Sequence, residues 1–235
     1  MYIAKLLFCA ILTAILAAAA TAQTLPSPPL SVLDSRPWEI GPLVQGGFGT
    51  SDRSSFHFLS GGMHLGKVLT PPAGPSLLRG QFEYGVEVDP YWQAFTPAPH
   101  MATASYVLDG RTYTEVVQIG GGTFSGVSIT PIILRWRLRS GSPHRAVPWI
   151  QGAGGVVWTN HKFPPDVEVP KGTPGGTSVF NFTPQFGVGF DYFVRRRRSV
   201  FFAANAVHIS SASLGDRNPG VNASVQFQLG YTWWK

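Results

Sequence analysis

The stretch from residue 180 to residue 194, FNFTPQFGVGFDYFV, alternates between two kinds of side chain with a period of two. The first set is apolar and consists of Phe180, Phe182, Pro184, Phe186, Val188, Phe190, Tyr192 and Val194. The second set is mostly polar or small and consists of Asn181, Thr183, Gln185, Gly187, Gly189, Asp191 and Phe193. Because successive side chains of a β-strand point to opposite faces, this stretch predicts a strand with one apolar and one polar face.

Two further stretches show the same period. Residues 225–233 alternate polar or small side chains with Val225, Phe227, Leu229, Tyr231 and Trp233. In residues 132–139, Arg135, Arg137 and Arg139 share the face opposite a mainly aliphatic one. Three arginines on one face are not tolerated toward lipid, so this face must look into a polar lumen or lie near the membrane interface.

The composition of the chain narrows the fold class. Glycine (27 residues) and proline (20 residues) are frequent, aromatic residues make up 13% of the chain, and charged residues also make up 13%. That charged share is about half the usual one. Beyond the N-terminal segment no run is apolar enough for a transmembrane helix, which predicts an all-β protein: an outer-membrane barrel or a soluble sandwich. Apolar faces with aromatic ends favour the barrel, as does a C-terminal strand that resembles the signal read by the barrel assembly machinery.

Residues 1–22 have the pattern of an export signal. Lys5 provides a positive charge, an apolar run follows it, and Ala20-Thr21-Ala22 resembles a signal peptidase cleavage site. The alternative is an anchoring helix, which would need about 20 apolar residues. We therefore expect a signal peptide at 1–22, a flexible leader at 23–36 and an outer-membrane β-barrel at 37–235.

Turn residues divide the rest of the chain into eight strands, an even number as bacterial barrels require. The expected strands are 38–48, 55–69, 77–91, 124–139, 147–159, 178–194, 200–210 and 222–234. Residues 101–119 are expected to form a hairpin within a long connection. With both termini in the periplasm, the longer connections at 50–54, 92–123, 160–177 and 211–221 are external. A pore is not expected, because side chains fill the interior of an eight-stranded barrel.

The net charge and the position of the single cysteine restrict the binding partners and the chemistry that the exported chain can have. Cys9 is the single cysteine and lies in the signal, so the exported chain has no disulfide framework and no thiol nucleophile. The net charge of +6 suits a phosphate-bearing lipid surface as well as nucleic acid, and export argues against nucleic acid. The run of four arginines at 195–198 is either a solvated periplasmic turn or a basic patch that holds anionic headgroups. A homodimer is compatible with the sequence.

Two acidic residues, Glu83 and Glu87, share one face of the third expected strand. If that face is the lumen, we expect them to pair with Arg135 or Arg137 rather than to form a catalytic carboxylate pair, because buried charges need partners. The histidines other than His208 show no metal-like spacing. We therefore predict no metal and no cofactor.

His208 and Ser210 form a candidate reactive pair. Residues two apart on a strand point to the same side, with Cβ atoms about 7 Å apart. A modest bend would bring an imidazole nitrogen within reach of the hydroxyl, as base-activated nucleophilic attack requires. The parity of the strands puts the pair at an external strand end. The alternative is that both residues are simply polar side chains at the membrane interface.

The segment 207–222, VHISSASLGDRNPGVN, resembles the lipid A 3-O-deacylase (acyloxyacyl hydrolase) family of outer-membrane barrels. That family carries a His-x-Ser-Asn strand end, a short loop with an Asn-Pro-Gly-like turn, and then the closing strand. Segments 79–84, 131–136, 154–160 and 181–183 also resemble parts of its longer members. The resemblance thus covers most of the chain after residue 22, and its specific part is the segment 207–222.

The resemblance implies an esterase that hydrolyses the 3-O-linked hydroxyacyl chain of lipid A in the outer membrane. Ser210 would be the nucleophile and His208 its general base, and water would release the fatty acid from an acyl-enzyme. Asn218 falls where the family has an asparagine suited to stabilising the oxyanion. Ser211 and Gly220 are the other residues expected to face the oxyanion or the substrate.

Two positions depart from the family's pattern. Ser211 replaces an asparagine, and Asn222 replaces the glutamate that orients the base. An amide oxygen can hold the tautomer of His208, but it cannot stabilise the imidazolium as a carboxylate does. Three interpretations stay open. Asn222 orients the base, as in Cys-His-Asn sites; Asp216, otherwise a turn residue beside Gly215, supplies the acid; or the barrel is inactive, with a structural, adhesive or envelope-stability role.

Overall fold

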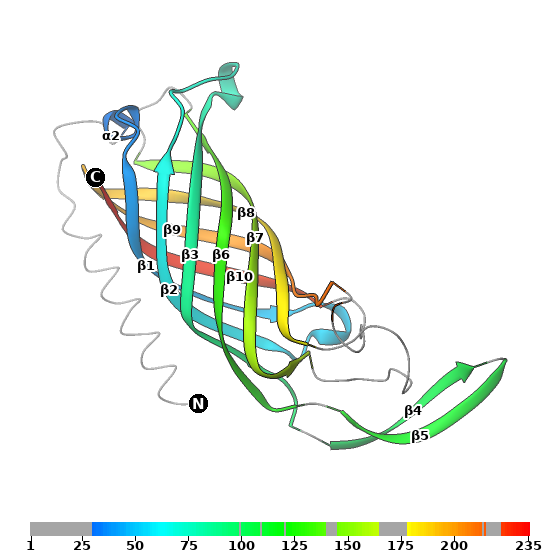
Figure 1. Ribbon diagram of the computed structural model, residues 1–235. Helices are drawn as coiled ribbons and strands as arrows, with labels where there is room; N and C mark the ends of the chain where they lie inside the picture. The colour runs from blue at the N-terminus through cyan, green and yellow to red at the C-terminus, as the bar shows by residue number, and fades with distance from the viewer. Residues whose placement is uncertain are drawn as a thin grey trace.

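The computed structural model describes residues 30–98, 100–108, 110–119, 121–139, 145–164, 178–212, 214 and 222–235. Eight strands close into an antiparallel barrel in the order β1-β10-β9-β8-β7-β6-β3-β2 (Figure 1). The barrel strands are β1 Trp38–Gly49, β2 His57–Val68, β3 Gly80–Phe95, β6 Thr123–Leu138, β7 Ala146–Phe163, β8 Ser178–Arg195, β9 Arg198–His208 and β10 Ala223–Trp234. The prediction of an all-β, eight-stranded antiparallel barrel is therefore confirmed.

The elements outside the barrel are short. They are helix α2 at Leu30–Asp34, the 3₁₀ helices η1 at Ser51–Arg53 and η2 at Ser76–Leu78, and a separate hairpin of β4 (His100–Leu108) and β5 (Arg111–Ile119). The hairpin extends from the end of the barrel opposite the C-terminus (Figure 1), within the connection where it was predicted. The third strand begins three residues later than expected, because η2 occupies its expected start, and it runs on to Phe95.

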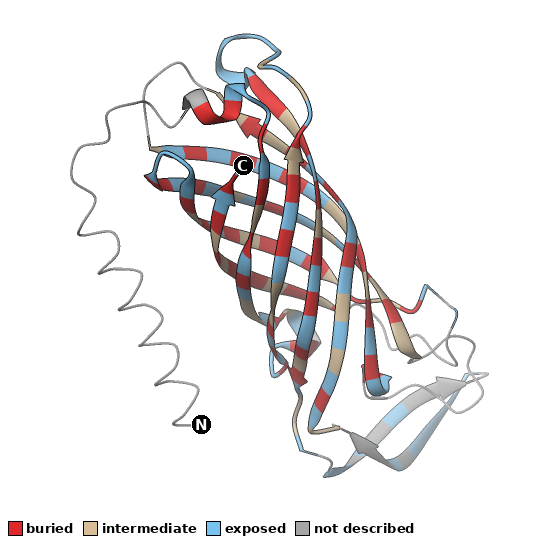
Figure 2. Cartoon of the chain, turned by 60° about the vertical axis from the view of Figure 1, so that its left-hand side comes forward, coloured by how far each residue is buried: buried red, intermediate tan, exposed pale blue. Residues whose placement is uncertain are grey.

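Burial alternates along the barrel strands, as the bands of Figure 2 show. In β9, for example, Ser199 and Asn205 are buried in the lumen, whereas Phe202 and Ala206 face outward and are exposed. The outward face is apolar over most strands, with exposed Val44, Leu65, Val88, Ile129, Leu134, Val188 and Phe227. A soluble protein rarely exposes so continuous an apolar surface, so this barrel spans a membrane. None of the helices in the described ranges has the length and hydropathy of a membrane-spanning helix.

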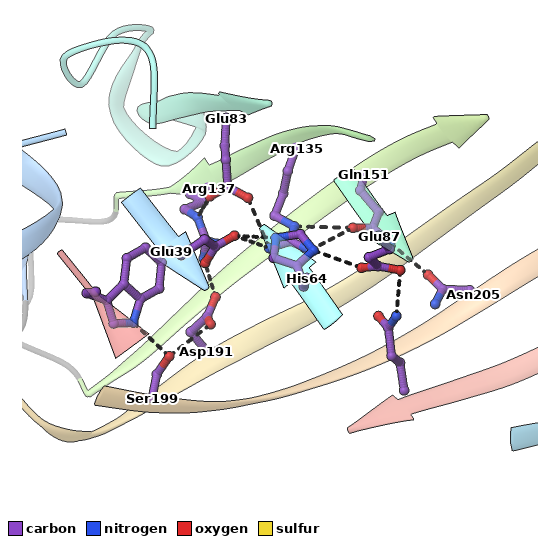
Figure 3. Close-up of polar contacts among 12 residues, drawn as sticks. Glu39, His64, Glu83, Glu87, Arg135, Arg137, Gln151, Asp191, Ser199 and Asn205 are labelled. Carbon is purple, nitrogen blue, oxygen red and sulfur yellow. Dashed lines mark hydrogen bonds and ion pairs between the residues drawn. The ribbon is translucent and has the colours of Figure 1, made fainter. Parts of the chain in front are cut away.

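A network of charged side chains lies inside the barrel (Figure 3). Arg137 is ion-paired with Glu39, at 2.8 Å, and also with Glu83 and Asp191. Arg135 lies 3.0 Å from Glu83 and 3.1 Å from Glu39. All five side chains are buried. The expected pairing of Glu83 with the two arginines is confirmed, and the arginine face is thus the lumen face.

The partner of Glu87 is different from the expected one. Its carboxylate lies 2.9 Å from Nδ1 of His64, and it accepts a hydrogen bond from Gln228, also at 2.9 Å. Nε2 of His64 lies 2.7 Å from Glu39, so this imidazole joins two carboxylates. Burial of these charges is tolerated because each one has an opposite charge or a hydrogen-bond partner within reach.

Apolar side chains close the lumen at both ends of the network. At the end facing the β4–β5 hairpin, Phe163 packs with its ring centroid 5.2 Å from that of Phe124 and 5.6 Å from that of Trp92. At the other end, Leu33 of α2 is fully buried in a cluster with Phe193, Trp234 and neighbouring valines. A cavity of about 20 Å³ lies between these clusters, which is enough for about one water molecule. The filled interior does not provide a pore.

Helix α2 comes from the segment predicted as a flexible leader. The carbonyl of Leu33 accepts a hydrogen bond from the Gln81 side chain at 3.1 Å, and Asp34 is ion-paired with Arg139 at 2.7 Å. These contacts hold the helix against the end of the barrel that carries the C-terminus (Figure 1). The sequence did not reveal this packing, because a five-residue helix is too short for a periodic signal.

We expect Arg137→Met to destabilise the barrel strongly. The substitution keeps the side chain long but leaves Glu39, Glu83 and Asp191 without a shared cation, which costs about 3–5 kcal/mol for a buried network. Urea unfolding of the refolded barrel, followed by tryptophan fluorescence, measures the change. Arg196→Met, in an exposed turn, is the matched control and should change the free energy of unfolding by less than about 0.5 kcal/mol. Equal stability of the two variants would contradict the role of the network.

Candidate active site

The end of β9 determines where His208 and Ser210 lie. Val207 and Ile209 point inward and are buried, at 5% and 1% exposure, in the apolar cluster around Phe163. Because neighbouring residues of an extended chain face opposite sides, His208 and Ser210 are turned to the outside of the barrel, and both are half-buried there. The packing of the lumen thus orients the candidate reactive pair.

The pairing of Ser210 with β8 supports this placement. Ser210 N donates to the carbonyl of Phe182 at 3.0 Å, and Phe182 N donates to the carbonyl of Ser210 at 2.7 Å. The offset is the one that pairs Gln185 with Val207, so the ladder continues past the last residue of β9 in register. His208 and Ser210 consequently share one outward face.

The side chains of the pair are not yet in contact. Within the described part of the chain, neither nitrogen of His208 is hydrogen-bonded to Ser210; the Ser210 hydroxyl accepts a hydrogen bond from Ala212 N at 3.1 Å. Catalytic hydrogen bonds are often long in the absence of substrate and tighten when it binds. The two side chains therefore lie on the same face at the spacing that a reactive pair requires. They must rotate to form the hydrogen bond between the imidazole and the hydroxyl.

A strained turn follows Ser210. Ala212 has φ of +50°, a left-handed conformation that costs a residue with a Cβ roughly 1–2 kcal/mol. Ser211 is buried, at 6% exposure, and its carbonyl accepts a hydrogen bond from Leu214 N at 2.9 Å. Strain of this kind concentrates at functional sites, and here it turns the chain sharply away from β9 directly after Ser210.

Asn222 lies beside this strand end through its backbone. Its carbonyl accepts a hydrogen bond from Ile209 N at 3.0 Å, and the next residue, Ala223, is the register partner of His208. Its side chain is buried, at 6% exposure, as are the inward-facing residues of β10. The Ile209–Asn222 hydrogen bond continues the β9–β10 register by one residue, so the buried side chain of Asn222 lies on the lumen side with Ile209, opposite the face of His208. Asp216, Asn218 and Gly220 lie outside the described residues.

The membrane-facing surface around the pair is aromatic and apolar. Phe180 lies between Trp158 and Phe182, with ring centroids 6.3 Å and 5.4 Å away. Farther along β9, the outward residues Ala206 and Ala204 are small and stand between larger side chains of β8 and β10. Aromatic residues gather at membrane interfaces, so the pair lies at the level where lipid headgroups meet acyl chains.

A second cluster, which the sequence did not reveal, has the residue types of a metal site. Ligand atoms of Glu39, His64 and Glu83 lie within 4.8 Å of one another in the lumen. The residues come from β1, β2 and β3, so no local spacing could have revealed them. Arg135 and Arg137 already bind these carboxylates, and a cation placed there would be repelled by both guanidinium groups. We therefore assign the cluster to the structural network.

Comparisons with known proteins match one family model and several solved structures, two of which are outer-membrane proteins. The family model described as lipid A 3-O-deacylase (PagL) matches residues 78–232. The solved outer membrane enzyme PagL is 14% identical, with 82% of this chain and 98% of that chain covered and a TM-score of 0.43. The outer membrane protein OprG from Pseudomonas aeruginosa is 10% identical, with 85% and 96% covered and a TM-score of 0.42. No curated protein sequence matches the chain significantly.

We expect added Zn²⁺ and added EDTA to leave the Tm of the barrel unchanged. A ligand that binds only the folded state raises the Tm, and the arginines that neutralise Glu39 and Glu83 leave no net attraction for a cation. Thermal unfolding in detergent is measured for the wild type and for His64→Gln. A Tm that rises with Zn²⁺ in the wild type but not in His64→Gln would contradict the structural assignment.

Proposed function

The chain belongs to the lipid A 3-O-deacylase family, and from that premise we propose that it hydrolyses the ester of the 3-O-linked hydroxyacyl chain of lipid A. The observation that carries the proposal is the family match over residues 78–232, which includes the C-terminal end of β9 and the start of β10. The barrel, with its apolar outer face, lies in the outer membrane. A lipid A ester lies near the headgroup level, so an enzyme that cleaves it needs reactive groups on its outer wall.

The proposed chemistry uses Ser210 as nucleophile and His208 as general base. His208 accepts the proton of the hydroxyl as Oγ bonds to the ester carbonyl carbon. The tetrahedral intermediate collapses, and the sugar hydroxyl leaves with the proton from His208. Water, deprotonated by His208, then attacks the acyl-Ser210 ester; the second tetrahedral intermediate collapses, His208 returns the proton to Oγ of Ser210, and the hydroxy fatty acid leaves. In each half-reaction the imidazole accepts one proton and gives it back, so the cycle balances without a cofactor.

We propose that Asn218 donates a hydrogen bond to the oxyanion, with Ser211 and Gly220 beside the substrate. A single donor of this kind lowers the barrier by about 3–4 kcal/mol. The small outward side chains of Ala206 and Ala204 leave room for an acyl chain along β9. This path begins at the proposed reactive pair and runs toward the membrane interior.

The orienting partner of His208 is the weakest part of the match to the family. We propose Asn222 for this role because its backbone is hydrogen-bonded to Ile209, next to the base, and the role requires its buried side chain to turn from the lumen side toward His208; Asp216 is the alternative acid. Asn222 also motivates a second candidate function. Without a carboxylate at this position, the barrel could serve as an inactive structural, adhesive or envelope-stability protein.

The remaining proposals concern export and partners. We propose that residues 1–22 are removed as a signal peptide; they lie outside the described residues. The barrel assembly machinery would insert the chain, with outer-membrane lipids around it, and a homodimer stays a proposal. None of these steps involves nucleic acid.

We expect Ser210→Ala to abolish release of the 3-hydroxyacyl chain. The substitution removes the nucleophile while leaving the strand end intact, and loss of a catalytic serine lowers kcat by about 10⁶-fold in serine proteases. Mass spectrometry of lipid A from cells that produce each variant measures the outcome. Ser125→Ala, an exposed serine at the same end of the barrel, is the control and should behave as wild type. Unmodified lipid A with the folded wild type would favour the inactive barrel instead.

We expect Asn222→Glu to increase deacylation. A carboxylate beside His208 stabilises the imidazolium that an amide cannot, and the reverse change in a serine protease costs about 10⁴ in rate. The initial rate of fatty acid release is measured on purified barrels in detergent. A folded Asn222→Glu barrel with an unchanged or lower rate would show that residue 222 is not the partner of His208.

A further inference from the structure

The end of the barrel that carries the C-terminus is strongly basic. Its exposed basic residues, which we call the basic rim, are Arg36, Arg79, Lys235 and the four residues from Arg195 to Arg198. Among the described residues of this end, Asp34 is the one exposed acidic side chain, and it is already ion-paired with Arg139. The rim therefore presents nearly uncompensated positive charge.

The opposite end has a balanced charge. By sequence, the four connections there, residues 50–56, 96–122, 160–177 and 211–222, contain five basic and six acidic residues. Because only one end of the barrel is basic, this positive charge does not reflect the overall composition of the exported chain. The basic rim lies on one side of the membrane.

Four successive arginines at the centre of the rim make an energetically unfavourable turn in water. Arg195 and Arg198 are register partners at the end of the β8–β9 ladder, with Arg196 and Arg197 in the turn between them. Like charges directly opposite each other destabilise a ladder. A turn of two residues needs no arginine at all, so four in succession are better explained by an anion that neutralises them.

Aromatic side chains fix the depth at which this anion lies. Trp38 and Trp233 face outward with 51% and 39% exposure, and Tyr192 precedes the rim on β8. Trp233 is the register partner of Arg198, so the arginines begin at the level of the aromatic residues. Outward aromatic residues mark the membrane interface, and the phosphate groups of phospholipids lie at that level.

We propose that the basic rim binds the phosphate groups of anionic glycerophospholipids in the membrane leaflet next to the chain's described termini, with the Arg195–Arg198 turn as its centre. Guanidinium groups match phosphate oxygens with two parallel hydrogen bonds. This interaction is independent of the esterase chemistry at the other end of the barrel. Phosphate binding at the rim fixes how deeply the barrel lies in the membrane, and so it keeps His208 and Ser210 at the headgroups of the opposite leaflet.

The test compares lipid retention by two charge-matched variants. Purified full-length barrels in a zwitterionic detergent are titrated with phosphatidylglycerol or phosphatidylcholine, and bound lipid is counted by native mass spectrometry. R196Q/R197Q should weaken phosphatidylglycerol binding roughly 30-fold, because each of the two removed basic residues contributes about 1 kcal/mol near an anionic surface. R111Q/K162Q, with the same charge change at the opposite end, should bind as wild type. Heat-modifiable migration on gels verifies that both variants are folded.

Three outcomes would overturn the proposal. Wild type could retain phosphatidylcholine as well as phosphatidylglycerol, or R111Q/K162Q could lose as much binding as R196Q/R197Q. In a parallel titration with lipid A, R196Q/R197Q could lose lipid A while keeping phosphatidylglycerol, which would assign the rim to that lipid. Fatty acid release by R196Q/R197Q in detergent should equal that of the wild type, so failure here is distinguishable from failure of the esterase proposal.

Discussion

Closure of the sheet is the constraint on which the rest of this structure depends. Hydrocarbon offers no hydrogen-bond partner, so every backbone N–H and C=O of a membrane-spanning strand must be paired within the protein. Here β1 pairs with both β2 and β10, which closes the described barrel. Eight strands enclose an interior that only side chains can fill, and alternation sends the polar set into it. Arg137 then joins carboxylates from β1, β3 and β8, which holds distant strands together.

The same alternation links the lumen to the proposed chemistry. Val207 and Ile209 are buried inside the barrel, and for that reason His208 and Ser210 face the lipid. A substrate that stays in the membrane can reach groups on the outer wall without entering a pocket. The apolar packing around Phe163 therefore fills this end of the lumen and also sets the direction of the candidate nucleophile and base.

Local sequence patterns predicted much of this fold. Contacts between residues that are far apart in the sequence could not be predicted from those patterns. Alternation predicted the eight strands and put Arg135 and Arg137 on one face, directed to the lumen or to the membrane interface, because side-chain direction in a strand depends on neighbouring residues. It did not predict that His64 bridges Glu39 and Glu87, since β1, β2 and β3 meet only after the register is fixed. The candidate pair of His208 and Ser210 could be predicted, because the two residues are two positions apart on one strand. The direction of the Asn222 side chain could not be predicted, because it depends on the pairing of Asn222 with Ile209 across two strands.

The central claim is that Ser210 is an activated nucleophile on the membrane-facing wall of the barrel. Labelling of purified barrels with a fluorophosphonate, followed by peptide mass spectrometry, tests it most directly, because only a serine with a neighbouring base reacts readily with such a probe. The account predicts one adduct, on Ser210, that is absent when His208 is replaced by alanine. An unlabelled Ser210, or labelling that persists in His208→Ala, would contradict it.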